Sequence, residues 1–96
     1  MGEKILYVKL SGSGNPDYDE PRDIGVPTEW RPVRDWADAS RIVRSFIDRW
    51  NLGGGNWTGG EIRQGSSTGK IIAHVSYNGR VWSGSRRSST KEILYS

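Results

Sequence analysis

Residues 70–84 read KIIAHVSYNGRVWSG, and this stretch decides how the rest of the chain must fold. Its first eight residues are rich in β-branched side chains, which favour a strand. Asn78 and Gly79 form the dipeptide most typical of a two-residue type I′ turn between antiparallel strands. The segment therefore predicts a β-hairpin with strands at residues 70–77 and 80–84.

A two-residue turn would fix the register of this hairpin, with Val75 opposite Trp82 and Ser76 opposite Val81. Because successive side chains of a strand point to opposite faces, the two faces of the hairpin would differ. One face would carry Ile71, Ala73, Val75, Tyr77 and Trp82. The pattern leaves open whether Tyr77 and Trp82 are core or surface residues.

Upstream of the hairpin, residues 36–51 carry the strongest helical periodicity in the chain. Asp35 is the expected N-cap, because its carboxylate can accept hydrogen bonds from the first turn. Gly53 is the expected residue of positive φ after the helix. The apolar residues that recur at helical spacing are Trp36, Ala39, Ile42, Val43, Phe46, Ile47 and Trp50. This single stripe is typical of a helix that packs on a sheet.

Shorter segments with a period of two complete the sheet. Residues 4–10 alternate, with Leu6 and Val8 on one face, and residues 61–64 form a second short strand. The sequence thus predicts one α+β domain over residues 1–96, in which an amphipathic helix packs on an antiparallel sheet of three to five strands. The element order is β-α-β-β-β, with a further strand at 91–95 as an alternative. We expect the core to contain Leu6, Val8, Ile42, Phe46, Trp50, Ile71, Val75 and Trp82.

Connecting segments differ in composition from these elements. Residues 11–35 hold all four prolines and an excess of acidic side chains, which predicts a long acidic loop. Residues 53–60 read GGGNWTGG, which predicts a Gly-rich connector between the helix and the antiparallel sheet of residues 61–95.

The composition excludes several classes of protein. The 96 residues contain no cysteine, so disulfides, thiolate zinc sites and cysteine nucleophiles are excluded. Absence of disulfide chemistry fits a reducing compartment. The chain shows no secretory leader and no run of roughly 18 apolar residues. We therefore expect a small soluble cytoplasmic domain that does not bind a membrane.

Catalytic and metal-binding patterns are weak. His74 is the only histidine, and no nucleophile-elbow pattern surrounds any serine. An EF-hand reading that starts at Asn15 fails, because Glu20 stands where glycine is required and Val26 where glutamate is required. The GSSTGK segment at 65–70 lacks the Walker A spacing and precedes a strand. We expect a binding protein with no cofactor and no metal rather than an enzyme.

Charge is distributed unevenly along the chain. Residues 1–35 hold five basic and seven acidic side chains, whereas residues 36–96 hold nine basic and four acidic ones. Cations neutralise phosphates and aromatic rings stack on bases, so the basic half suggests nucleic-acid binding. The candidate contact residues for this hypothesis are Arg63, Lys70, Arg80, Arg86, Arg87, Lys91 and Trp57.

The alternative hypothesis is a protein-interaction module, such as an inhibitory or accessory protein. The acidic loop offers residues of the types that anchor interfaces, and its candidates are Tyr18, Asp19, Glu20 and Trp30. A terminal strand at KEILYS (91–96) could also pair with a protein partner or with a second copy in a homo-oligomer.

Overall fold

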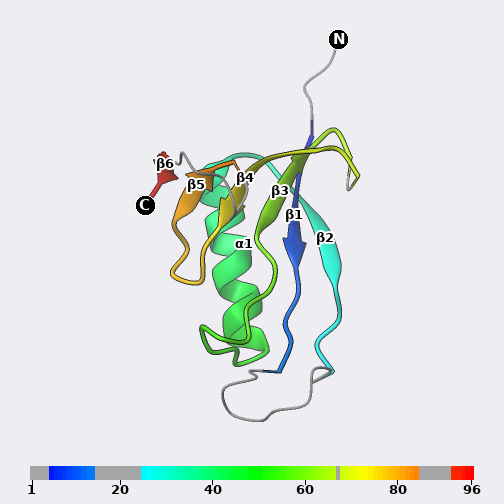
Figure 1. Cartoon of the computed structure of the whole chain (residues 1–96), viewed down its shortest axis with the longest axis vertical. Helices are drawn as coiled ribbons and strands as arrows, with labels where there is room; N and C mark the ends of the chain where they lie inside the picture. The colour runs from blue at the N-terminus through cyan, green and yellow to red at the C-terminus, as the bar shows by residue number, and fades with distance from the viewer. Residues whose placement is uncertain (1–4, 15–24, 67, 85–91) are drawn as a thin grey trace.

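The computed structural model describes residues 5–14, 25–66, 68–84 and 92–96 of the chain. Within these ranges, one helix packs on one face of a six-stranded antiparallel sheet, which confirms the predicted α+β fold (Figure 1). The spatial order of the strands is β2-β1-β3-β4-β5-β6, so β2 and β6 form the edges. The elements are β1 (Leu6–Leu10), β2 (Glu29–Val33), α1 (Trp36–Arg49), β3 (Glu61–Gln64), β4 (Lys70–Val75), β5 (Val81–Ser83) and β6 (Ile93–Tyr95).

Strand β2 corrects the prediction of a continuous loop over residues 11–35. It pairs antiparallel with β1, with Val33 opposite Leu6. Pro32 makes this strand hard to predict from the sequence, because proline has no N–H to donate to the hydrogen-bond ladder of a sheet. An edge strand tolerates proline, since one of its sides needs no partner. The part of the predicted loop at 15–24 lies outside the described residues.

Helix α1 begins as predicted and ends earlier. The carboxylate of Asp35 accepts a hydrogen bond from the Asp38 amide at 2.8 Å, so the predicted N-cap is confirmed. In return, the Asp38 carboxylate accepts from the Arg34 amide at 3.0 Å. At the other end the helix closes at Arg49, and Asn51 rather than Gly53 adopts the positive φ, of 51°.

The hairpin between β4 and β5 has a different register from the one predicted. Val75 pairs with Val81, and His74 pairs with Trp82. The Gly79 amide donates to the Ser76 carbonyl, and the Ser76 amide donates to the Arg80 carbonyl, so the loop is one residue longer than a type I′ turn allows. Gly79 carries the positive φ, of 87°.

This register shift of one residue moves Trp82 to the opposite face of the sheet. The core prediction is therefore wrong for Trp82, which shares the face of His74. It is also wrong for Ile71, which pairs with Arg63 and shares the face of that side chain. Val8, Phe46 and Val75 are buried in the core as expected, while Leu6, Ile42 and Trp50 pack against its margin.

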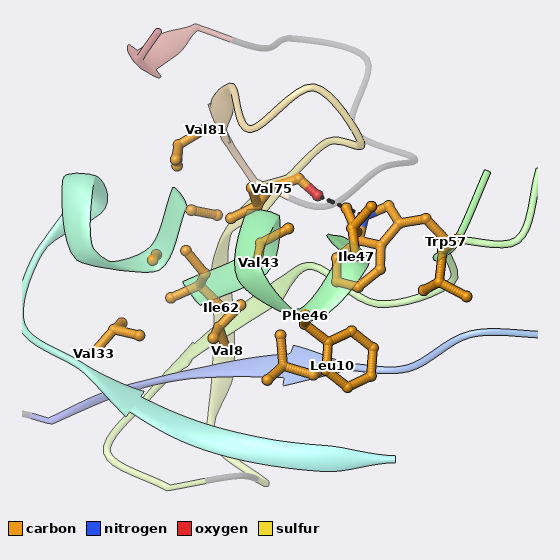
Figure 2. Packing of buried hydrophobic residues seen from close by; sticks show 13 residues of the cluster. Val8, Leu10, Val33, Val43, Phe46, Ile47, Trp57, Ile62, Val75 and Val81 are labelled. Atoms are coloured by element: carbon orange, nitrogen blue, oxygen red, sulfur yellow. Dashed lines mark hydrogen bonds between the residues drawn. The ribbon is translucent and has the colours of Figure 1, made fainter. Parts of the chain in front are cut away.

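The core lies between α1 and one face of the sheet (Figure 2). Aliphatic side chains dominate it, and Phe46 contacts Trp57 edge to face with ring centroids 6.1 Å apart. Figure 2 shows the Trp57 indole aimed at β4, where its Nε1–H donates to the Val75 carbonyl at 3.1 Å. The buried apolar residues are Val8, Leu10, Val33, Ala39, Val43, Phe46, Ile47, Leu52, Trp57, Ile62, Ala73, Val75 and Val81.

The Gly-rich connector extends the pairing of β1 instead of forming a free loop. Trp57 makes an isolated antiparallel bridge with Gly12, and the Gly60 amide donates to the Lys9 carbonyl at 2.7 Å. Gly60 has φ of 107°, and a Cβ there would lie 2.2 Å from the Val75 carbonyl oxygen. The Val75 amide donates to the Gly60 carbonyl at 2.8 Å, and glycine is therefore required where the connector lies against the end of β4.

Candidate nucleic-acid interface

The sheet face opposite α1, here called the open face, carries aromatic and cationic side chains. Residues paired across antiparallel strands lie on the same face. Lys9 pairs with Trp30, and Tyr7 pairs with Arg63, while Val8 between them points into the core. The strand alternation therefore places Tyr7, Lys9, Trp30 and Arg63 together on the open face.

Arg63 connects the side chains at this end of the open face. Its guanidinium lies 5.6 Å from the centroid of the Trp30 ring, which is a cation–π geometry. It also donates to the Gly69 carbonyl at 2.8 Å and to the Glu61 carboxylate at 3.1 Å. With its side chain 26% exposed, Arg63 is held in place and still reaches solvent.

A second aromatic–cation pair lies further along the same face. Trp82 is half-buried, and the Arg80 guanidinium lies 5.7 Å from its ring centroid. His74 is opposite Trp82 on β4 and is buried, with Nδ1 3.0 Å from the Gly84 carbonyl oxygen. His74 is therefore a packed strand histidine, and we assign no catalytic role to it.

We call this set of open-face residues the open-face cluster. It consists of Tyr7, Lys9, Trp30, Arg63, Arg80 and Trp82. Strands are separated by about 4.8 Å, so Trp30 on β2 and Trp82 on β5 lie roughly 19 Å apart across the sheet. The cluster thus presents half-buried aromatic rings interleaved with cations. Glu61 pairs with His74, so it lies on the same face, where it forms an ion pair with Arg63.

The structure separates the residues proposed from the sequence for nucleic-acid binding. Arg63 and Arg80 belong to the open-face cluster, whereas Lys70 pairs with Gln64 and lies on the face of Leu6. Trp57 is 4% exposed, so it does not present the accessible ring face that stacking on a base needs. The remaining candidates, Arg86, Arg87 and Lys91, lie outside the described residues.

The residues proposed for an interaction loop are also divided. Trp30 belongs to β2 and not to a loop, because it pairs with Lys9. Tyr18, Asp19 and Glu20 lie outside the part of the chain that the structure describes.

Sequence reasoning missed Tyr7 and Lys9 as site residues and assigned Trp82 to the core. A signal for the first two was present, because the alternation of residues 4–10 places them opposite the buried Val8. Trp82 gave no such signal, since its face depends on the length of the hairpin loop.

The described ranges hold no group of three or more histidine, cysteine or carboxylate side chains placed to share a metal ion. None of the helices in those ranges is long and apolar enough to cross a membrane. Comparison with protein-family models, with curated proteins and with solved structures finds no match to this chain. The geometry of the open face therefore carries the functional argument.

Proposed function

We propose that this protein binds single-stranded nucleic acid on the open-face cluster. The observation that carries the proposal is the segregation of side chains between the two faces of the sheet. Tyr7, Trp30 and Trp82 lie on the face that α1 does not cover, and Lys9, Arg63 and Arg80 lie among them.

Each component of the cluster matches one part of a nucleotide. Aromatic rings on an open sheet stack on unpaired bases, which contributes about 1–3 kcal/mol per base. Cations neutralise the phosphates between those bases. Because stacking needs accessible base faces, the cluster favours a single strand over a duplex.

The direct test is a binding titration with fluorescein-labelled oligothymidylate and oligouridylate, each of about twelve nucleotides, followed by anisotropy. Wild-type protein should bind these oligomers more tightly than a duplex of the same length. Trp30→Ala should weaken binding about tenfold, which corresponds to the loss of one stacked base.

Tyr95→Ala is the matched control, because Tyr95 is also an exposed aromatic residue of a strand. It pairs with Val81, which faces the core, so it lies on the other face of the sheet. This variant should bind like wild type. If Trp30→Ala and Tyr95→Ala lost the same affinity for the oligonucleotide, binding would not depend on the face that an aromatic residue occupies. That result would overturn the proposal.

The contribution of phosphates is measured by the salt dependence of the same titration. Arg80→Ala should flatten the slope of log affinity against log salt by about 0.7, the value for one phosphate contact of a single strand. Absence of binding at low salt would end the nucleic-acid hypothesis.

A further inference from the structure

A groove lies on the side of the sheet that α1 covers, opposite the open face. It runs between α1 and the edge strand β2. One hollow of about 250 Å³ is lined by Glu29, Arg31 and the second half of α1. It adjoins another of about 590 Å³, lined by Pro32, Val33 and the first half of α1. Arg41 and Ile42 line both hollows, which therefore form one feature, here called the α1–β2 groove.

The rim of this groove is mainly cationic, because four arginines line it against the two carboxylates of Glu29 and Asp38. Arg41 and Arg49 lie eight residues apart on α1, so they fall on the same side of the helix, with Ser45 between them. Arg31 reaches the groove from β2. Asp38 forms ion pairs with Arg34 and Arg41, which leaves Arg31 and Arg49 without a carboxylate at ion-pair distance among the described residues.

The floor of the groove is apolar. Leu10 and Val33 line the groove and are buried, while Ile5, which also lines it, is 52% exposed, although large apolar side chains are usually buried. Phe46 also lines it but is only 5% exposed, so its ring is not free to stack on a base. An apolar floor below a mainly cationic rim suits a peptide with apolar and acidic side chains better than it suits a nucleic acid.

Strand β2 is an edge strand of the sheet, and it borders the groove along its whole length. It pairs with β1 on one side, and in the described part of the chain no strand pairs with its other side (Figure 1). Its five residues span roughly 17 Å, the length of five or six residues of an extended peptide. Pro32 offers no N–H to an added strand, so arginine contacts must provide much of the affinity.

We infer that the α1–β2 groove binds an extended, acidic segment of a partner protein, in which acidic residues alternate with apolar ones. The apolar side chains would lie on the floor, and the carboxylates would bind Arg31 and Arg49. This site is separate from the open-face cluster, and the inference does not depend on the proposed nucleic-acid binding.

The test uses an octapeptide of alternating glutamate and valine, and a second peptide with lysine in place of glutamate. Isothermal titration calorimetry with the full chain should detect binding of the glutamate peptide and none of the lysine peptide. Arg31→Glu and Arg49→Glu should each weaken binding about tenfold or more, because each reverses one charge-assisted contact.

Lys70→Glu is the matched control, since it makes the same change of charge at an exposed site that does not line the groove. It should change the affinity by less than about twofold, because exposed charges that are far apart are screened by salt. Thermal unfolding of each variant establishes that the fold is kept.

Several outcomes would overturn the inference. Equal binding of the two peptides, or an equal loss in Lys70→Glu, would show that the groove does not select acidic segments. Displacement of the peptide by oligothymidylate would show that the groove is a nucleic-acid site. Self-association that Arg49→Glu abolishes would make a second copy of this chain the occupant. Loss of peptide binding in Trp30→Ala, together with loss of oligonucleotide binding, would show that the groove is not a site separate from the open face.

Discussion

The two faces of the sheet are built from the same strands, yet they have opposite chemistry. On the face covered by α1, Val8, Ile62, Ala73, Val75 and Val81 are fully buried. On the open face, the residues next to them in the chain include Tyr7, Arg63 and Trp82. The difference shows that strand alternation alone can place the packing residues on one face and the residues of the proposed binding site on the other.

The largest effect should come from removing the tryptophan of the covered face. Trp57→Ala removes a buried ring and the hydrogen bond to the Val75 carbonyl, and it should lower the free energy of unfolding by about 3–5 kcal/mol. Trp30→Ala, on the open face, should cost about 1 kcal/mol through its contact with Arg63. Urea denaturation measures both values, and similar losses would contradict the division between the faces.

A smaller loss of stability is expected from a substitution in the loop between β4 and β5. This loop sets the register of β5 and therefore the face on which Trp82 lies. Gly79→Ala puts a side chain at φ of 87°, with its Cβ 3.0 Å from Ser40 Oγ, and should cost about 1–2 kcal/mol. Gly54→Ala is the control, because its nearest neighbour would be 3.9 Å away. If Gly79→Ala and Gly54→Ala were equally stable to heat, the positive φ of Gly79 and its close contact with Ser40 would be contradicted.

The helix that covers one face depends on its first turn. Asp35→Ala removes the N-cap contact to the Asp38 amide and should lower the free energy of unfolding by about 1 kcal/mol. Asp48→Ala removes an exposed carboxylate 3.9 Å from Arg44 and should have almost no effect. Chemical denaturation of the pair checks this, and a larger loss in Asp48→Ala would contradict it.

The smallest effect is a dependence on pH at the same end of α1. The Arg34 amide, together with the Arg41 guanidinium, lowers the pKa of Asp38 below its ordinary value, although burial opposes this shift. A carboxyl whose pKa is lowered by folding stabilises the protein above its unfolded pKa, near 3.9, and loses that contribution as the pH falls.

Wild type and Asp38→Asn should therefore differ in unfolding free energy by less than about 1 kcal/mol at neutral pH, because both arginine partners of Asp38 are largely exposed. The difference should shrink below about pH 4, when the wild-type carboxyl becomes protonated. Thermal unfolding between pH 7 and pH 3 provides the measurement. If the difference in unfolding free energy grew as the pH fell, the prediction would be contradicted.

Local patterns predicted the elements whose structure depends on local interactions. Helical spacing and the Asp35 cap located α1, and the period of two located β3 at residues 61–64. Strand β2 was missed because its evidence is non-local. Its five residues include a proline, and only pairing with β1 makes them a strand.

The candidate site was predicted less completely, because the face of a side chain depends on register. Charge pattern identified Arg63 and Arg80, which both lie beside open-face aromatics. Trp82 lies on the open face and not in the predicted core, because the hairpin loop is one residue longer than predicted. Trp57 lies in the core and not on the surface, where the connector forms a bridge to Gly12. Neither effect has a signature in the local sequence.

The distribution of tryptophans gives the molecule its own optical reporters. The Trp57 indole is in an apolar environment and out of reach of solvent, so its emission should be blue-shifted and insensitive to iodide. Trp30 and Trp82 are half-buried on the open face, and iodide should quench their emission. An oligonucleotide bound at the open face would shield these two residues and leave Trp57 unchanged, whereas unfolding would also expose Trp57. The half-buried Trp36 and Trp50 contribute to the same emission, so the two events are distinguished by whether the emission that iodide cannot reach is kept or lost.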